Sequence, residues 1–310
     1  MKDFIRNIII SLFFCSNLSG QTINLTGIIN DNTGKPLEMA NIMVLNHFFG
    51  TTSDSNGYFE LTVPQSLKND TVVFSYMGYH SKHICICDLK NKITLKPLVI
   101  LLPEVYVQAD SIQLSKQIIV NKFKKRKCYI KYSADSVNNK FWIPFRPKQP
   151  TIEAIYFPFN NNYKNKKIKE IRLYLSTFII PSLFRLRIFS ANKNRKPDYD
   201  LLTEPVEIKV KKNRSLVTIN LEKYDLTFNK NGIFVGIELL VIPENKSTFK
   251  YDSVEYTIYS PYLNYINTRD KGLSWIYSAG KWTKDESIAP LFDKRNKKMY
   301  YKPAITLLLY

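Results

Sequence analysis

The chain has 310 residues, about twice the length of a typical single domain, which predicts two domains. Hydrophobic residues make up 45% and charged residues 23%, which excludes a mostly disordered chain, and the modest glycine and proline content excludes a collagen-like rod. The net charge of +19 raises nucleic acid or an anionic surface as a partner. We favour a compositional origin of this excess, because an A/T-rich genome over-supplies lysine, asparagine and tyrosine; a functional basic face is the alternative. No nucleic-acid-binding module is recognisable, so we expect no nucleic-acid partner.

Residues 1–20 have the features of a secretory signal peptide. Lys2 and Arg6 give a positive start, residues 8–14 form a short apolar core, and small residues precede Gln21. Cys15 follows Phe14, where a lipobox needs a small residue, so we expect cleavage without lipidation. No later segment approaches eighteen continuous apolar residues, so the sequence predicts an exported chain whose mature part has no transmembrane span.

Residues 22–107 read as short strands separated by turns. Residues 30–36 and 54–57 are rich in Asn, Asp, Gly and Pro, the residues that favour tight turns. The segments between them alternate or run apolar, as strands do. Strands are expected at residues 23–28, 40–45, 58–63, 71–76, a segment ending at 86, 93–95 and 104–107. Seven strands in so short a stretch predict a small antiparallel sandwich.

Five motifs in this region occur in an order that indicates a family. They are Thr26-Gly27, then TGKPL at 33–37, ANI at 40–42, TTSDSNGYF at 51–59 and FSYMGY at 74–79. The series resembles the carboxypeptidase-like regulatory domain, over residues 22–107 only. The resemblance implies a transthyretin-like sandwich and a non-catalytic accessory domain, a domain that also precedes TonB-dependent outer-membrane receptors. Residues 108–310 do not supply the plug and long barrel strands of such a receptor, so we do not expect a transporter.

Three cysteines remain after the predicted signal, namely Cys85, Cys87 and Cys128. Cys85 and Cys87 lie two apart in an expected strand, on the same face and with no turn that would let them pair. We therefore expect buried structural thiols. A metal site at this C-x-C motif is the alternative, but no second ligand pair accompanies it, and we expect no metal and no cofactor.

Residues 108–150 are expected to form a basic connector. Ile112, Ile119 and Phe123 have the spacing of an apolar helical stripe, and lysines and Arg126 surround them. The sequence thus predicts a short basic helix over residues 112–127. Such a helix either packs on its neighbours with a solvated lysine face or makes peripheral contact with an anionic membrane.

From residue 151 the strand signals resume and continue to residue 310. Strands are expected at 152–157, 168–174, 184–189, 206–210, 216–221, 233–241, 254–259, 274–277 and 304–309. This number of strands, with turns such as that at 229–232, predicts a second, larger, jelly-roll-like β-sandwich. The whole chain is therefore expected to be all-β apart from the connector.

The residues needed for several kinds of catalysis are missing from the large domain. All three histidines precede residue 84, which excludes a Ser-His-Asp, Cys-His or HExxH site there. Paired carboxylates remain, with Glu153, Glu170, Glu204, Glu238 and Glu255 as candidates for a glycosidase acid, and Glu238 stands out because it lies within an apolar run. Nothing identifies a partner for it, so we expect a strand-edge or salt-bridged glutamate instead. An acidic group at Asp198, Asp200 and Glu204 suits calcium chemically, although its spacing is not that of an EF-hand.

Aromatic residues give the best indication of a binding site. Seven crowd one stretch of the large domain, where sugar rings or a protein partner would stack on them. They are Tyr256, Tyr259, Tyr262, Tyr265, Trp275, Tyr277 and Trp282. The alternative is that many of them fill the core. Separately, Asp-Ser/Thr-Val triplets at 70–72, 110–112 (Asp-Ser-Ile), 135–137 and 252–254 resemble an O-glycosylation signal of exported bacterial proteins.

These observations together predict an exported, non-enzymatic, two-domain β protein. We expect it in the periplasm or at the outer membrane, as a binding or assembly module whose ligand is a glycan or an envelope protein. A carboxylate-based glycoside hydrolase and a purely structural envelope protein are the alternatives.

Overall fold

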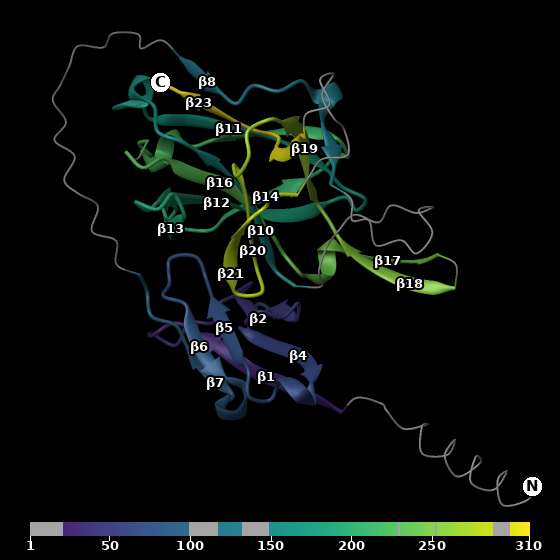
Figure 1. Cartoon of the computed structure of the whole chain (residues 1–310). Coiled ribbons are helices and arrows are strands. Elements are labelled where there is room, and N and C mark those ends of the chain that lie inside the picture. Colours follow the sequence, from purple (N-terminus) through teal and green to yellow (C-terminus); the bar gives the residue numbers. More distant parts are fainter. Residues whose placement is uncertain (1–20, 99–116, 132–148, 229, 252, 288–297) are drawn as a thin grey trace, which may run out of the picture.

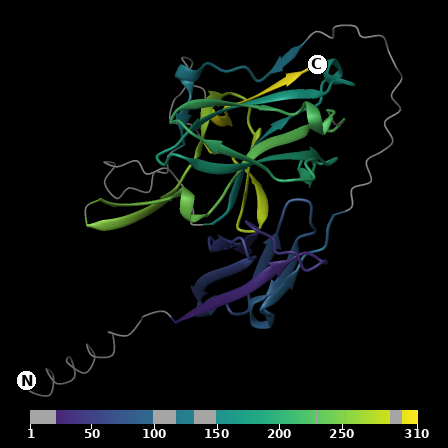
Figure 2. The same cartoon turned by 180° about the vertical axis from the view of Figure 1, so that it is seen from behind.

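The computed structural model describes residues 21–98, 117–131, 149–228, 230–251, 253–287 and 298–310. Within these residues every regular element is a strand or a short 3-10 turn, which confirms the all-β prediction. Figure 1 shows two β bodies, with the smaller N-terminal one (purple to blue) lying against one side of the larger one, and Figure 2 shows the same contact from behind. No helix in the described part of the chain is long and apolar enough to cross a membrane.

The small body is a sandwich of a three-stranded and a four-stranded sheet, ordered β4-β1-β7 and β3-β2-β5-β6. Its strands are β1 (Thr22–Asn30), β2 (Asn41–Val44), β3 (Gly50–Thr52), β4 (Tyr58–Pro64), β5 (Thr71–Ser75), β6 (Lys82–Cys85) and β7 (Lys92–Thr94). Alternate residues point inward, and Phe59 and Phe74 meet edge to face across the core with ring centres 5.6 Å apart. Gly57 is required in the turn before β4, because its φ is +74° and a Cβ there would lie 2.4 Å from the carbonyl oxygen of Ile29. The strand expected at 104–107 lies outside the described residues.

The expectation of free, buried thiols at the C-x-C motif is wrong. Cys85 and Cys87 form a disulfide in the structure. The strand β6 ends at Cys85, and residues Ile86–Asp88 make a 3-10 turn instead of continuing the strand. The turn brings the two side chains to one side with their Cα atoms 5.3 Å apart, a separation that a disulfide requires. Neither cysteine is buried, whereas Ile86 between them packs into the core.

The large body is a sandwich of two seven-stranded sheets. The first sheet contains β10 (Thr151–Phe157), β12 (Ser182–Ala191), β13 (Pro197–Asp200), β14 (Val206–Val210), β16 (Ile233–Leu239), β20 (Ser274–Ser278) and β21 (Lys281–Lys284). The second contains β8 (Ile118–Val120), β9 (Tyr129–Ile130), β11 (Ile168–Ser176), β15 (Ser215–Asn220), β19 (Tyr262–Thr268), β22 (Tyr300–Pro303) and β23 (Ile305–Leu309). A separate hairpin, β17 (Lys246–Tyr251) and β18 (Val254–Tyr259), projects from the body (Figure 1). The apolar inner faces of the two sheets enclose the main core.

The helix expected over residues 112–127 is not formed in the part of that segment that the structure describes. Ile118–Val120 is the strand β8, which pairs with β23, and Lys125–Lys127 is one 3-10 turn. Ile119 of the expected stripe is 47% exposed, whereas its neighbours Ile118 and Val120 pack against the main core. Pairing with a distant strand therefore overrides the local helical pattern. Residues 112–116 lie outside the described residues.

The first sheet has a second face that carries charge. On β12 and β16, residues such as Leu186 and Ile237 point into the main core. Their neighbours Arg185, Arg187 and Glu238 therefore point to the opposite face, because side chains alternate along a strand. These three are almost entirely buried, since the small body covers them.

Candidate functional site

A hairpin turn of the large body docks onto the small body. The turn between β20 and β21 consists of Ala279 and Gly280, both with positive φ, as a two-residue hairpin loop needs. The backbone N–H of Asn46 donates to the carbonyl oxygen of Ala279 at 2.9 Å, and Lys281 Nζ donates to Asn46 Oδ1 at 2.8 Å. A Cβ on Gly280 would lie 3.0 Å from side-chain atoms of both Leu45 and Val73. Gly280 therefore lets the turn approach the small body closely.

A buried ionic network lies beside this contact and joins the two bodies. Glu238 Oε2 accepts from Arg187 Nη1 at 2.8 Å and from Arg185 Nη1 at 3.3 Å, while Arg187 Nε donates to Asp200 at 2.6 Å. The side-chain amide of Asn41, on β2 of the small body, donates to the other oxygen of Glu238. Two buried positive and two buried negative charges balance, and this balance is what makes such burial tolerable.

The small body also contacts Arg185 directly. Arg185 Nη1 donates to the carbonyl oxygen of Met39 at 3.4 Å, and the guanidinium carbon lies 5.4 Å from the ring centre of Tyr76. Its Nη2 donates to Glu207, a half-exposed carboxylate at the rim of the network, at 3.1 Å. The N-terminal body is thus held by a planar cation as well as by the Glu238 carboxylate.

The environment of Glu238 excludes its use as a glycosidase acid. Burial acts to raise the pKa of Glu238, but the charges of Arg187 and Arg185 outweigh it and hold that pKa below its ordinary value. Asp200 is shifted the other way, because burial raises its pKa more than Arg187 lowers it. Glu238 is fully inaccessible and ionised, so it can neither meet a sugar nor donate a proton near neutral pH. The glycosidase alternative therefore fails at Glu238, which is instead salt-bridged to Arg185 and Arg187.

The acidic group predicted as a possible calcium site is not assembled. Asp200 pairs with Arg187, and Glu204 instead pairs with Lys223 at 3.0 Å. Among the described residues the one set of three ligand-type side chains close together is Cys85, Cys87 and Asp88, in which both sulfurs are already in the disulfide.

The structure distributes the seven predicted aromatic residues over several places and forms no single platform from them. Trp275 is buried against Phe234, and Tyr277 and Trp282 pack against each other with ring centres 5.4 Å apart beside the interface. Tyr256 stacks on Phe249 in the projecting hairpin, and Tyr259 lines a cleft between the two bodies. Tyr277 and Trp282 also line a second cavity beside the interface. Tyr262 and Tyr265, on β19, line one common cavity.

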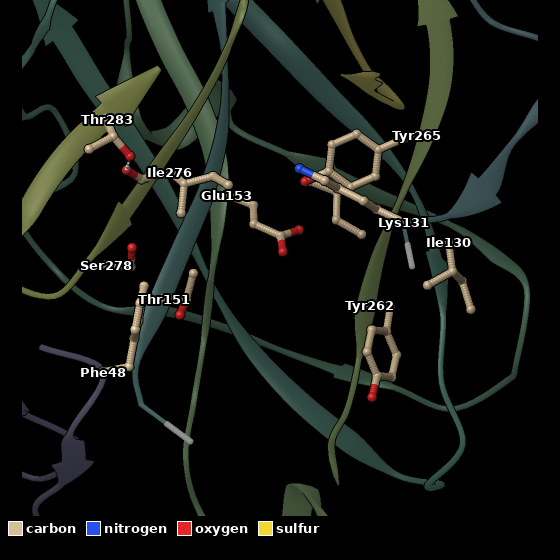
Figure 3. Close-up of a pocket in the computed structure, with 11 residues that line it drawn as sticks. Phe48, Ile130, Lys131, Thr151, Glu153, Tyr262, Tyr265, Ile276, Ser278 and Thr283 are labelled. Atoms are coloured by element: carbon tan, nitrogen blue, oxygen red, sulfur yellow. Dashed lines mark hydrogen bonds between the residues drawn. The ribbon is translucent and has the colours of Figure 1, made fainter. Parts of the chain in front are cut away.

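That cavity is the candidate binding site and is drawn in Figure 3. Its volume is about 140 Å³. The walls are largely apolar, and Phe48 of the small body contributes to one side. Thr151, Ser278 and Thr283 supply hydroxyl groups, and Lys131 and Glu153 supply opposite charges. In Figure 3 the Glu153 carboxylate points toward the side of the cavity where Lys131, Tyr262 and Tyr265 lie.

Glu153 is the polar group best placed to bind a ligand. It alternates with Thr151 on β10, so both lie on the inner face of the first sheet. Its Oε2 is buried and, within the described residues, accepts no hydrogen bond. Lys131 instead pairs with Asp285 at 2.6 Å, which leaves the Glu153 oxygen for a donor from elsewhere. A carboxylate acceptor beside tyrosine rings suits hydroxyl-bearing ligands such as sugars.

Sequence reasoning had named Glu153 only as one of five candidate acids and had missed Lys131, Thr151, Ser278 and Thr283. The alternation of Thr151 with Glu153 was visible in the sequence, but the other residues reach the cavity through pairings between distant strands. Of the predicted glycosylation sites, Thr71 lies in β5 and Ser253 is exposed in the turn after β17. Ser111 and Ser136 lie outside the described residues.

Comparison with known proteins concerns the small body. Residues 25–107 match the model of the CarboxypepD_reg-like domain, a regulatory rather than a catalytic family. The TonB-dependent receptor SusC of Bacteroides thetaiotaomicron is 33% identical over 100 residues, which make up 32% of this chain. The matched stretch is 10% of the receptor's length, so the receptor is similar to this chain over a small part of itself. Residues 25–107 are therefore a CarboxypepD_reg-like domain, the family that the ordered motifs indicated.

Proposed function

We propose that the protein is an exported, non-catalytic binding module of the bacterial cell envelope, located in the periplasm or at the outer membrane, and that its ligand is a glycan. The CarboxypepD_reg-like domain and its similarity to part of a TonB-dependent receptor support an envelope role. The buried network and the docked hairpin support a rigid connection between that domain and the larger sandwich. In this proposal the larger sandwich holds the ligand.

The observation that carries the proposal is the cavity of Figure 3. Tyr262 and Tyr265 line it, each only 2% exposed. The Glu153 oxygen that has no partner among the described residues offers an acceptor for a sugar hydroxyl. The volume is below the ~300–1,000 Å³ of sites for drug-sized molecules, so we expect one sugar ring to enter and the rest of the glycan to lie outside.

A blocked cavity tests this proposal. Thr283, exposed on β21 at the edge of the cavity, is replaced in the variant Thr283→Trp, and the purified mature chain is applied to an array of neutral and acidic glycans. We expect at least about tenfold weaker binding than wild type, because the indole occupies the space of the ligand. The control is Thr218→Trp, the same change on the exposed edge of β15, where no described cavity lies. An empty array for the wild-type protein, or equal binding by T283W and wild type, contradicts the glycan proposal.

A second candidate is contact with an envelope protein. Phe178 and Ile180 are 55% and 59% exposed in the loop between β11 and β12, and neighbouring exposed apolar side chains often mark interaction sites. Pull-down from envelope extracts with wild type and with Phe178→Ser/Ile180→Ser separates the two candidates. A partner that is lost with the loop variant and retained by T283W favours assembly over glycan binding.

A further inference from the structure

A basic groove lies on the large body, formed by residues 122–127 together with Arg214. Five of the six residues in the segment are cations, and none of them pairs with a carboxylate in the described part of the chain. Arg214 likewise has no acidic partner there. Arg172, Arg185 and Arg187 of the same body illustrate the contrast, since each contacts a carboxylate. The groove therefore concentrates positive charge that the described fold does not neutralise.

The groove consists of two neighbouring cavities. One, of about 230 Å³, is lined by Lys125, Arg126 and Arg214 together with Tyr174, Ser176 and Asn264. The other, of about 940 Å³, is lined by Lys122, Lys124 and Lys127 among others. Arg126, Cys128 and Tyr129 line both. The positive charge thus surrounds a concave site with a small compartment and a longer extension.

The small compartment has polar groups that the described fold leaves unused. Ser176 and Asn264 are each only 2% exposed. Ser176 Oγ and Asn264 Oδ1 form no hydrogen bond within the described residues, and a buried polar atom without a partner costs free energy. An amide oxygen accepts and does not donate, so an anion alone cannot satisfy Asn264 Oδ1. A ligand that satisfies both kinds of group carries negative charge and hydroxyl donors.

We propose that this groove binds an anionic saccharide, that is, a glycan whose sugars bear carboxylate, sulfate or phosphate groups. Lys125, Arg126 and Arg214 hold the anionic group through charge-assisted hydrogen bonds. Ser176 and Asn264 bind the hydroxyls of the same sugar, and the larger cavity accepts the following sugars of the chain. Burial raises the pKa of the Cys128 thiol to about 11, so Cys128 stays neutral beside the anion.

A membrane surface fits these observations less well. A lipid headgroup layer is met by protruding cations and by apolar side chains inserted among the lipids. Here Arg126 and Arg214 line a concavity, and the unused polar atoms of Ser176 and Asn264 lie at nearly inaccessible side chains. Phe123 lines the larger cavity and is not one of the large hydrophobic residues that are exposed in the described chain.

The proposal deepens the proposed function and rests on it, since it names an acidic class of glycan. The test measures binding of oligogalacturonate to the purified mature chain by calorimetry, with neutral oligogalactose, inorganic phosphate and phosphatidylcholine vesicles containing phosphatidylglycerol as the other probes. The variants are Arg126→Gln/Arg214→Gln and Ser176→Ala. Lys193→Gln/Arg195→Gln, at an exposed turn of the same body that lines none of the described cavities, removes the same charge as a control.

We expect oligogalacturonate to bind wild type and the control alike, about tenfold or more weakly to R126Q/R214Q, and a few-fold more weakly to S176A. We expect binding to weaken with added salt, and oligogalactose to be insensitive to the groove variants. Equal affinity of R126Q/R214Q and wild type for oligogalacturonate overturns the proposal, as does phosphate or vesicle binding in the absence of oligogalacturonate binding. Neutral-glycan binding that only T283W abolishes would leave the proposed function standing and remove this inference, whereas no glycan binding at all removes both.

Discussion

At the scale of single residues, one carboxylate joins the two bodies. Glu238 receives hydrogen bonds from Arg185 and Arg187 of its own sheet and from Asn41 of the CarboxypepD_reg-like domain. It is fully buried beside Ile152 of the neighbouring strand β10, so a loss of its charge leaves two buried guanidinium groups short of a partner. The role of this residue is therefore structural, and its loss should be costly.

The variant Glu238→Gln tests this role. We expect it to lower the free energy of unfolding by about 3 kcal/mol or more in urea titrations near neutral pH, because removing one partner strands buried charge. Glu207→Gln is the control at the rim of the same network, and we expect a loss of about 1 kcal/mol or less because that carboxylate is partly exposed. Similar losses for the two variants would contradict the central role of Glu238.

The pH dependence of the difference in unfolding free energy between wild type and E238Q gives an independent test. The pKa of Glu238 is lower in the folded chain than in the unfolded one, so its charge stabilises the fold above the ordinary glutamate value of about 4.3. This contribution disappears as the pH falls through the lowered pKa. We expect the gap in unfolding free energy between wild type and E238Q to be constant near neutral pH and to narrow below about pH 4. A gap that widens on acidification would show that the pKa of Glu238 is raised, and not lowered, in the folded chain.

At the scale of elements, the alternation of apolar and polar residues in the sequence predicted most of the long strands but few of the short ones. Val206–Val210 and Val254–Tyr259 have the bounds expected from sequence. The strands β3 and β21 have three and four residues and exist because a neighbour pairs with them. The helix prediction around β8 fails for a related reason. This strand forms by pairing with β23, which is far away in the sequence, so the local pattern does not reveal it.

The β20–β21 turn allows the contact between the bodies to be tested with a matched pair of glycines. Gly280 and Gly272 have φ values of +74° and +76°, so alanine suffers the same backbone strain at both. At Gly280 the new methyl group also meets Leu45 and Val73 at 3.0 Å, whereas at Gly272 the nearest atom, Lys284 Cδ, lies at 3.9 Å. We expect Gly280→Ala to lose about 1 kcal/mol more than Gly272→Ala in urea unfolding. Equal losses would mean that the turn does not pack tightly on the small body.

At the scale of the whole molecule, the buried network makes the two bodies one cooperative unit. We expect a single transition for wild type in differential scanning calorimetry, and two transitions for E238Q, because weakening the interface lets each core melt separately. G272A, whose change lies away from the interface, is the control and should keep one transition. Two transitions in wild type would contradict a tight union of the bodies.

The arrangement of the whole molecule explains which parts of the candidate sites could be predicted from the sequence. The five sequence motifs were sufficient to predict the family of the small body, because each motif lies within a few consecutive residues. Arg185, Arg187 and Glu238 alternate with core residues in the sequence, yet their meeting depends on the register of β12 against β16. Tyr262 and Tyr265 were predicted as binding residues, but Glu153 joins them only because the two sheets face each other across the cavity.

The position of β23 has a consequence for how the protein matures. This strand, residues Ile305–Leu309, lies between β11 and β8 and contributes Ile305, Leu307 and Leu309 to the main core. The large sandwich cannot close until these residues have emerged, whereas the CarboxypepD_reg-like domain needs only residues near the start. During synthesis the small body can therefore fold first, while the sheets of the large body stay open until residues 305–309 are available. Chaperones should therefore be needed mainly by the larger sandwich, until β23 pairs with β11 and β8.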